Sequence, residues 1–550
     1  MGADDGVAGA PSAMHSQKEE AVFSAIKAGD IPTATRLAIL ALADGAEHPV
    51  LLSLRALDFE NSGRFNEALT DLRRAHVLAP SDPAILNASG LTLARMERWE
   101  EARACYERAL ALKPDFGQAW FNRGHVLERL GEAGEGARSY ARAVEIHPQN
   151  VQAWANMATL AARRGDAEST REHAKAALDL QPGHPTAILA LASVEMNEPR
   201  RAEERLRGLL KEALSPFDRA MALGQLADVL DALDRPAQAF DAYAASNKVF
   251  RDSLSPRFNA PGQVTIAHTQ NWLVSWAEKL KAEDWVAEPE EAENFGGERG
   301  HVFLVGFPRS GTTLMETVLA ANPDVVSLEE RETLRAAVLA FLCSPRDLDH
   351  LTKARGPVLR ELRKDYWANV RSFGIEPAGK IFIDKNPFNT LKLPLIRKLF
   401  PSARILFARR DPREVVLSCF RRRFSFNAST FEFLDLKSAA ASYDRTMRLA
   451  ASLRAKLGFD EFTLIYEELI ADLPTVAKTA CEFIGSEWRP EFADVAGRAQ
   501  RGEVASASSA QIARGLYTDG TAHWRRYRAQ LAPVLPILAP WVEAFGYPAE

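Results

Sequence analysis

The chain has 550 residues, of which 47% are hydrophobic and 26% are charged, and its formal net charge at pH 7 is −5. This length exceeds what a single hydrophobic core supports, so two or more domains are expected. The composition is that of an ordinary globular protein, and so small a net charge gives no reason to expect binding to nucleic acid or to an anionic membrane.

The cysteines and the N-terminal residues indicate in which cellular compartment the chain is expected. The four cysteines lie far apart with no Cys-x-x-Cys pair, which is typical of reduced, buried thiols in a cytosolic protein. The eleven histidines do not cluster at metal-ligand spacing, so no metal site is expected. Residues 1–17 have neither the basic nor the apolar segment of a signal peptide, and no apolar run is long enough to cross a membrane. We therefore expect a cytoplasmic chain without a membrane span, whose residues 1–14 are disordered.

A 34-residue period runs through the first half of the chain. Prolines recur at this spacing, alanines stand five residues before them, and small residues stand 24 residues before them. The prolines are Pro80, Pro114, Pro148 and Pro182, the alanines are Ala75, Ala109, Ala143 and Ala177, and the small residues are Ala56, Gly90, Gly124 and Ala158. The period predicts one pair of antiparallel helices per repeat, in which small residues mark close helix contacts and proline ends the second helix.

This pattern resembles the tetratricopeptide repeat (TPR) over residues 15–253, and it is strongest over residues 49–184. The resemblance implies an α-solenoid whose concave groove binds a peptide or a partner protein. Large side chains at the repeat positions are expected to form the core between helices, and these are Tyr106, Trp120, Tyr140 and Trp154. The sequence leaves open what the groove binds.

Residues 254–299 are predicted to join two domains. Residues 264–281 have a helical pattern, and the acidic stretch that follows ends in a Gly-Gly pair, which is typical of a linker. The second domain is therefore expected to span residues 300–550.

A phosphate-binding loop is predicted at the start of this second domain. The apolar run 301–305 suits a buried parallel strand, and it is followed by the loop Gly306–Thr313 and by a helical pattern. Backbone N–H groups of such a loop converge on one anion. The spacing matches the Walker A motif, but Thr312 stands where nucleoside triphosphatases need lysine, which argues against hydrolysis of ATP or GTP. An arginine, Arg309, lies inside the loop instead.

The string Pro-Arg-Ser-Gly-Thr-Thr after an apolar strand resembles the 5′-phosphosulfate loop of the sulfotransferases, most closely that of the tyrosylprotein branch. The resemblance implies an α/β domain with a central parallel sheet that binds 3′-phosphoadenosine 5′-phosphosulfate (PAPS) as co-substrate, without a metal. It also implies that the loop holds the 5′ end of this nucleotide, through Arg309, Ser310, Gly311, Thr312 and Thr313.

A second anion site is predicted after the apolar strand Arg404–Arg409. The stretch from Arg397 to Arg423 has nine basic and two acidic residues. The family resemblance assigns Arg410 and Ser418 to the 3′-phosphate, and a guanidinium is well suited to bidentate bonds with phosphate. For Arg421 and Arg423 in the same stretch, a solvated helix face is the favoured interpretation.

The catalytic groups are expected between these two sites. The apolar segment Ile381–Ile383 leads to Lys385, which the resemblance places on the bridging or leaving phosphate. A proton must also be taken from the attacking hydroxyl. Glu330 falls where the tyrosylprotein branch has its base, with Glu329 as the second candidate, and a helix-capping or surface role for both glutamates stays open.

The C-terminal part supplies the remaining nucleotide contacts. Phe462–Tyr466 is expected to be a strand, and Tyr466 begins a Tyr-Glu-Glu-Leu string that the resemblance places on the nucleotide. Ser508 has the spacing of a serine that closes over the nucleotide. His523 stands where the family usually has lysine or arginine, and Gly520 where it often has serine, so the contacts of this lid are left open.

These residues predict a sulfotransferase that moves a sulfuryl group from PAPS to a hydroxyl acceptor. Glu330, Arg309 and Lys385 are the expected catalytic residues. The expected partners are the nucleotide, the acceptor and a protein bound by the repeats. The acceptor is open between a peptide tyrosine and a glycan or small molecule. Two other functions also stay open: a non-catalytic nucleotide-binding scaffold, and a P-loop kinase or nucleoside triphosphatase.

Overall fold

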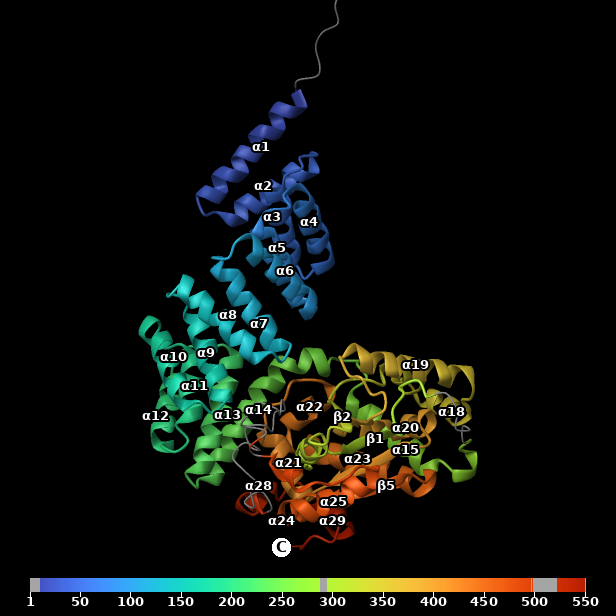
Figure 1. The fold of residues 1–550 in the computed structure, drawn as a ribbon. Helices are drawn as coiled ribbons and strands as arrows, with labels where there is room; N and C mark the ends of the chain where they lie inside the picture. The colour runs from blue at the N-terminus through green and yellow to red at the C-terminus, as the bar shows by residue number, and fades with distance from the viewer. Residues whose placement is uncertain (1–9, 287–293, 496, 498–521, 550) are drawn as a thin grey trace, which may run out of the picture. The chain divides into compact units, whose positions relative to one another are not determined.

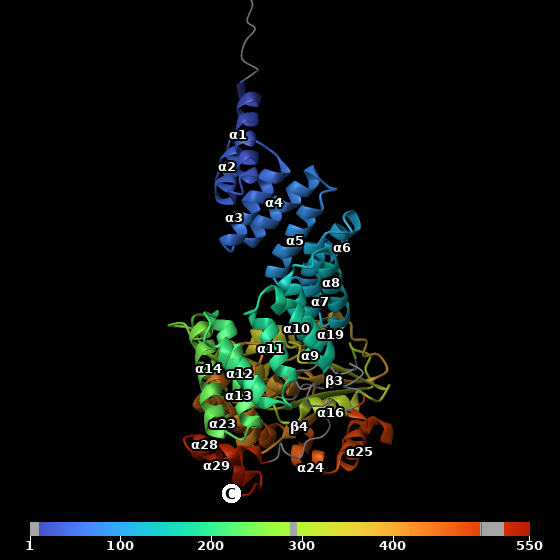
Figure 2. The same ribbon diagram turned by 90° about the vertical axis from the view of Figure 1, so that its left-hand side faces the viewer.

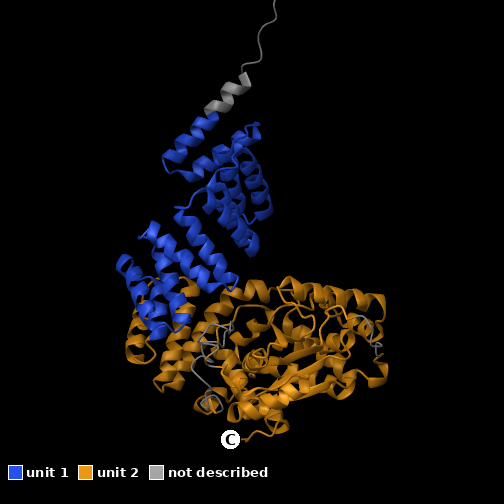
Figure 3. Cartoon of the chain, in the orientation of Figure 1, with its two compact units in different colours: residues 1–194 blue, residues 195–550 orange. Residues whose placement is uncertain are grey.

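The computed structural model describes residues 10–286, 294–495, 497 and 522–549 (Figure 1). By the density of internal contacts the chain divides into two compact units, residues 1–194 and residues 195–550 (Figure 3). The predicted fold class is confirmed, because a helical solenoid precedes an α/β domain with a central parallel sheet.

The first unit consists of helices that pack in consecutive pairs. The helices are α1 (Ala10–Lys27), α2 (Ile31–Ala43), α3 (Pro49–Asn61), α4 (Phe65–Leu78), α5 (Pro83–Arg95), α6 (Trp99–Leu112), α7 (Gly117–Arg129), α8 (Ala133–Ile146), α9 (Val151–Arg163), α10 (Ala167–Leu180) and α11 (Pro185–Val194). The helices α4, α6, α8 and α10 each end two residues before one of the periodic prolines. Proline lacks the N–H group that the next helical turn would need.

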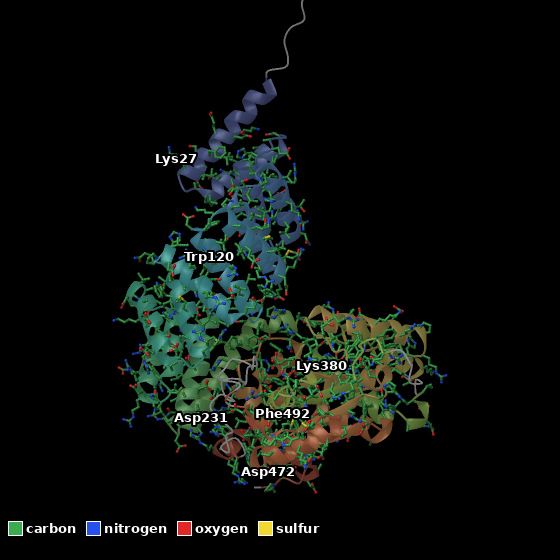
Figure 4. The ribbon with its side chains drawn as sticks, viewed as in Figure 1. Lys27, Trp120, Asp231, Lys380, Asp472 and Phe492 are labelled. Carbon is green, nitrogen blue, oxygen red and sulfur yellow. The ribbon has the colours of Figure 1, made fainter. Side chains whose placement is uncertain are left out.

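Small residues of the repeats lie where helices touch. A Cβ atom on Gly90 would come within 2.7 Å of the Tyr106 ring, and one on Gly124 within 2.7 Å of the Tyr140 ring. Both tyrosines are buried. Trp120, marked on α7 in Figure 4, is half-buried, and its indole N–H donates to the carbonyl of Pro114 at 2.8 Å. The aromatic side chains therefore join neighbouring helices and hold the end of one repeat against the start of the next.

The second unit begins with three further helices and the helix of the predicted junction. These are α12 (Pro199–Leu209), α13 (Pro216–Ala232), α14 (Pro236–Phe258) and α15 (Ile266–Lys279). Helix α15 packs on α23 (Leu436–Leu457), where Gln270 donates to Ser442 at 3.0 Å and Lys456 donates to the carbonyl of Ala277 at 2.7 Å. Residues 266–279 are therefore part of the body of the second unit.

Five parallel strands form the sheet of the second unit. They are β1 (Gly300–Gly306), β2 (Val325–Glu329), β3 (Ile381–Lys385), β4 (Arg404–Arg409) and β5 (Asp460–Ile465), in the order β2-β3-β1-β4-β5. Glu329 and Leu304 both pair with Lys385 across the sheet, and Gly306 pairs with Ala408. The carboxyl ends of four strands thus meet at one edge, which is where α/β sheets bind ligands.

Helices cover both faces of this sheet. On one face, Val302 and Leu304 pack in a core with side chains of α16 (Thr312–Leu319) and α25 (Leu473–Ile484), and Figure 2 shows α16 and α25 beside β3 and β4. On the other face, Phe303 and Phe382 contact aromatic rings of α19 (Pro357–Ser372). The alternation of faces along β1 follows from the two-residue period of a strand.

Shorter elements complete the unit. They are η1 (Ala282–Asp284), α17 (Arg335–Phe341), α18 (Pro345–Lys353), η2 (Pro387–Lys392), α20 (Leu393–Leu399), α21 (Pro412–Arg421), α22 (Ala428–Phe431), η3 (Glu432–Leu434), α24 (Tyr466–Ala471), η4 (Pro490–Ala493), η6 (His523–Tyr527), α28 (Arg528–Leu531) and α29 (Leu535–Ala544). None of the helices described is both long and apolar enough to cross a bilayer. The expectation of uniformly buried thiols is wrong, because Cys343 is exposed.

Helix α13 is tied to α21 through a buried carboxylate, Asp231, which Figure 4 marks. Asp231 accepts hydrogen bonds from Arg421 at 2.5 Å and from Tyr527 at 2.7 Å, and it lies 3.0 Å from a guanidinium nitrogen of Arg526. Burial alone would raise the pKa of Asp231, but hydrogen bonds and charges from His523, Arg421 and Tyr527 hold it below its usual range.

The interpretation of Arg421 and Arg423 as solvated side chains is wrong. Arg421 pairs with Asp231, and Arg423 donates to Asp228 at 2.9 Å. Both arginines are more than two thirds buried, since 21% and 28% of their side chains are exposed. These residues lie about 190 positions apart in the chain, so the pairing depends on tertiary structure that the local sequence does not reveal.

Replacing Asp231 by asparagine should destabilise the second unit. The change removes the carboxylate that hydrogen-bonds the buried Arg421 guanidinium, which costs about 3 kcal/mol in comparable sites. Asp234→Asn is the matched control, because the Asp234 side chain is 88% exposed and its pair with Arg526 is worth about 1 kcal/mol or less. Chemical denaturation of the full chain measures both. Equal losses in the two variants would show that the Asp231 network does not hold α13 to α21.

Candidate functional site

Close backbone contacts define the loop that follows β1. A Cβ on Gly306 would lie 2.5 Å from the carbonyl oxygen of Ala408, so only glycine allows β1 to end this close to β4. The N–H of Gly306 donates to the hydroxyl of Thr390 at 2.9 Å, and that hydroxyl donates to the carbonyl of Gly306 at 2.5 Å. Thr390 thereby fixes the start of the loop.

The loop ends at Gly311, the N-cap residue of α16, which has a left-handed backbone with φ of 95°. Among the residues that the structure describes, no side chain caps this helix, so the N–H groups of its first turn, from Thr312 and Thr313, can bind an anion. A Cβ on Gly311 would lie 2.6 Å from the Tyr466 ring. Tyr466 therefore packs directly against the end of the loop.

Arg309 connects the loop to α21. Its backbone is left-handed, with φ of 74°, its Nε donates to the hydroxyl of Ser418 at 3.1 Å, and its carbonyl accepts from Arg410 at 3.0 Å. Burial is the main cause that lowers the pKa of Arg309 to about 9, and the charges of Arg422 and Arg410 also contribute. Buried cations gathered this closely are stabilised by an anion among them.

Arg410 and Tyr466 form the side of this cluster next to β5. Arg410 is buried, its guanidinium lies 4.3 Å from the centre of the Tyr466 ring, and it comes within 3.7 Å of Glu414 on α21. Glu414 in turn accepts from the backbone N–H of Trp524 at 2.9 Å. The arginine is therefore held on two sides.

Arg422 is a residue of this site that the sequence analysis missed. It follows α21, lies near enough to Arg309 to lower the pKa of that residue, and is half-buried. Among the described residues no carboxylate or carbonyl pairs with its guanidinium, whereas Arg421 and Arg423 on either side pair with aspartates of α13. A run of three arginines does not indicate which of them is free to bind a ligand.

Lys385, at the end of β3, is surrounded by three carboxylates. Its Nζ lies 2.9 Å from Glu329, 3.0 Å from Glu330 and 3.2 Å from Glu316, and its side chain is fully buried. Burial alone would lower the pKa of Lys385, but the charges of Glu316, Glu330 and Glu329 hold it above its usual range. The lysine is therefore positively charged at neutral pH.

Glu330 is the most exposed of these carboxylates, with 56% of its side chain exposed. Its backbone is left-handed, with φ of 48°, and its N–H donates to the carbonyl of Lys385 at 2.7 Å. This conformation costs a non-glycine residue about 1 kcal/mol or more, so the surrounding structure must hold it. A carboxylate in this position can accept a proton from a molecule at the sheet edge.

Asp384 anchors the segment after Glu330. It accepts hydrogen bonds from Thr333 at 2.7 Å, from Tyr366 at 2.9 Å and from Asn389 at 3.1 Å. Burial raises the pKa of Asp384 to about 6. Thr333 lies three residues beyond Glu330, so this buried carboxylate holds the strained turn in place. The sequence analysis did not assign a role to Asp384.

The residues proposed from sequence thus fall into two clusters. Arg309, Ser418, Arg410 and Tyr466 form the first, and Lys385, Glu329 and Glu330 form the second. Ser310 and Thr312 are buried in the loop, and Thr313 is half-buried. Ser508 lies outside the described residues, as does Gly520. His523 has its Nε2 3.1 Å from Asp231.

Within residues 10–286, 294–495 and 522–549, no group of three histidine, cysteine, aspartate or glutamate side chains is placed to hold a metal ion.

Several ranges of the chain match models of known protein families. Residues 301–490 match the model of the sulfotransferase family. Residues 87–151 match a tetratricopeptide repeat model, and residues 126–244 match that of the middle TPR-like domain of cilia and flagella-associated protein 70. The chain therefore combines tetratricopeptide repeats with a domain of the sulfotransferase family.

Individual proteins are similar to parts of the chain. An uncharacterized protein of Aquifex aeolicus is 23% identical over 377 residues, which cover 64% of this chain and 46% of the relative. Protein-tyrosine sulfotransferase 1 of Danio rerio is 24% identical over 259 residues, which cover 45% of this chain and 72% of the relative. The chain spans about half the length of several of the curated relatives it matches. Among solved structures, a tetratricopeptide repeat protein from Parabacteroides merdae is 16% identical, covers 43% of this chain and 93% of its own, and has a TM-score of 0.35.

Gly311→Ala should destabilise the protein by displacing the Tyr466 ring. Gly374→Ala is the control, because Gly374 has a similarly left-handed backbone, with φ of 77°, but no atom lies within 4 Å of the added Cβ. Both variants carry the backbone strain, and only Gly311→Ala adds a clash, which costs about 1–3 kcal/mol in packed sites. Denaturation midpoints compare the two. A loss no larger for Gly311→Ala than for Gly374→Ala would refute the close contact with Tyr466.

Proposed function

We propose that the second unit transfers a sulfuryl group from PAPS to a hydroxyl acceptor. The observation that carries this proposal is the direct contact between the loop and α21, in which Arg309 donates to Ser418 at 3.1 Å and Arg410 donates to the Arg309 carbonyl at 3.0 Å. A nucleotide with anionic groups at both its 5′ and its 3′ positions would meet both halves of this contact. The family match of residues 301–490 supports the same reaction class.

The two ends of the nucleotide would bind different groups. The 5′-phosphosulfate would be held by backbone N–H groups of the loop and of α16, including those of Ser310, Gly311, Thr312 and Thr313. The 3′-phosphate would be held by Arg410, Ser418 and Arg422, since guanidinium groups form charge-assisted bonds with phosphate. Tyr466 and Ser508 are proposed as further nucleotide contacts.

The transfer itself would be an in-line displacement at sulfur. A bond forms between the acceptor oxygen and sulfur as the bond from sulfur to the 5′-phosphate oxygen breaks, and the acceptor proton passes to Glu330. Negative charge then develops on the departing phosphate oxygen. Arg309, Lys385 and the amides of the loop are the groups proposed to stabilise this charge.

The acceptor proposed for this reaction is a peptide tyrosine. The relatives that carry a functional name are protein-tyrosine sulfotransferases, of Danio rerio and Drosophila melanogaster among others. The TPR solenoid is proposed to recruit the acceptor or a partner protein, because repeat grooves are suited to extended peptides. A glycan or a small molecule delivered by such a partner is the alternative acceptor.

Two observations favour this function over its rivals. Thr312 replaces the lysine that a P-loop kinase needs on its phosphates. A non-catalytic scaffold would not need an exposed carboxylate in a strained backbone conformation beside a buried lysine, as found at Glu330.

The proposed nucleotide site predicts a preference for adenosine 3′,5′-bisphosphate over ATP. Adenosine 3′,5′-bisphosphate should raise the melting temperature of the full chain, and ATP with Mg²⁺ should not. Arg422→Ala should weaken the bisphosphate by about tenfold or more, because a hydrogen bond to a charged group is worth about 1.5–3 kcal/mol. Arg423→Ala is the control, since Arg423 is engaged by Asp228. Stronger stabilisation by ATP, or equal effects of the two substitutions, would contradict the assignment.

If Glu330 is the general base, its replacement should lower turnover. Glu330→Gln should lower the rate of sulfate transfer about 10²-fold or more, as removal of a general base commonly does, while nucleotide affinity changes little. The exposed Glu361, which pairs with Lys364 one turn away, gives the control Glu361→Gln. Transfer of radiolabelled sulfate from PAPS to tyrosine-containing peptides measures the rate. Turnover equal in Glu330→Gln and in the unaltered chain would exclude Glu330 as the base.

A further inference from the structure

One of the three carboxylates around Lys385 belongs to the helix that starts at the anion loop. Glu316, in the second turn of α16, places Oε2 3.2 Å from the lysine Nζ, and 8% of its side chain is exposed. Glu329 and Glu330 come from the end of β2, and 30% and 56% of their side chains are exposed. Glu316 is therefore the carboxylate that water reaches least. No role for Glu316 follows from the sequence alone.

The charges of this cluster do not balance. If all three glutamates are ionised, one ammonium faces three carboxylates, and the surplus of two negative charges lies beside the loop that would bind a phosphosulfate. Like charges at such short range oppose each other strongly in a partly buried site. An ammonium surrounded in this way also has little charge left to stabilise a leaving phosphate.

The surroundings of Glu316 single it out as the carboxylate that gains a proton most easily. Burial raises the pKa of Glu316 to about 7, although the charge of Lys385 acts against this, and the charge of Glu329 raises it further. The side chain of Ser327 on β2 hydrogen-bonds to it and slightly favours the charged form. The other elements packed on α16 bring apolar side chains and the buried Cys481, and the one acidic residue of η4, Glu491, is exposed.

We propose that Glu316 takes up a proton from solvent when the sulfated nucleotide binds, and that this frees the Lys385 ammonium to face the leaving phosphate. Glu316 acts through Lys385 and is thus a positioning residue. The inference rests on the proposed nucleotide site. It adds to that proposal a proton that enters with the nucleotide and is separate from the proton that Glu330 accepts.

The sign of the pH dependence follows from this coupling. An anion bound near Glu316 disfavours its charged form, so binding raises the pKa of Glu316 above its value in the free protein. Above about pH 7 the free protein has lost this proton and must regain it on binding. Affinity for the nucleotide therefore falls by up to about tenfold per pH unit as the pH rises from 7 toward 9. Below about pH 6.5 the affinity does not change with pH, apart from the effect of titrating the nucleotide itself.

Calorimetric titration with adenosine 3′,5′-bisphosphate tests this at pH 8, in two buffers with different ionisation enthalpies. The unaltered chain should take up close to one proton per nucleotide, and Glu316→Gln should take up none, with an affinity at pH 8 equal to or higher than that of the unaltered chain. Phosphate monoesters titrate near pH 6, so the difference between the two proteins at pH 8 isolates the contribution of the protein. Glu329→Gln, which alters the same lysine from a more exposed position, should retain the uptake.

Three results would overturn the inference. The first is that Glu316→Gln still takes up a proton when the nucleotide binds. The second is that Glu329→Gln, and not Glu316→Gln, loses this proton uptake. The third is that the affinity of the unaltered chain for the nucleotide does not change between pH 7 and pH 9. The last measurement needs no variant, so it decides the matter even if Glu316→Gln fails to fold. Failure of the unaltered chain to bind the bisphosphate at all would instead reject the proposed function, and the two failures are therefore distinct.

Discussion

Two hydrogen bonds join the loop after β1 to the helix after β4: Arg309 donates to Ser418, and Arg410 donates to the carbonyl of Arg309. They are possible because β1 and β4 are parallel neighbours whose carboxyl ends lie side by side, with Gly306 paired to Ala408. A Cβ on Gly306 would separate the two strands. The two elements proposed to bind anions therefore form one surface, and the sheet sets the spacing between the groups proposed for the 5′ and 3′ ends of a nucleotide.

The far end of α21 is held by a part of the chain that resembles a repeat. Asp231 of α13 engages Arg421, and Asn247 of α14 donates to the carbonyl of Phe420 at 2.8 Å. Helices α13 and α14 lie in the same compact unit as the sheet. In this architecture the last repeat-like helix pair supports the helix that carries Ser418 and leads to Arg422. The sulfotransferase-type domain and this helix pair are thus one structural body.

Much of the fold could be predicted from the sequence because its signals are local. The 34-residue period marks the solenoid, an apolar run before a glycine-bounded loop marks β1, and apolar runs that end in Lys385 and Arg409 mark β3 and β4. Strand β2 gave no such signal, since it lies at the sheet edge and three of its five residues are half-exposed. The roles of Glu316, Arg422 and Asp231 could not be found in this way. Glu316 is the charged residue of a helix otherwise made of apolar residues and threonines, and Asp231 depends on Arg421, which lies 190 residues away. The position of Arg422 next to Arg309 likewise depends on tertiary structure.

The most direct test of the account is a crystal structure of the full chain with adenosine 3′,5′-bisphosphate. The account predicts the 5′-phosphate on the N–H groups of the loop and of α16, and the 3′-phosphate among Arg410, Ser418 and Arg422, with Lys385 turned toward the 5′ end. An empty loop with the nucleotide bound elsewhere, or a 3′-phosphate that does not contact α21, would contradict the claim that one surface binds both ends of a sulfated nucleotide.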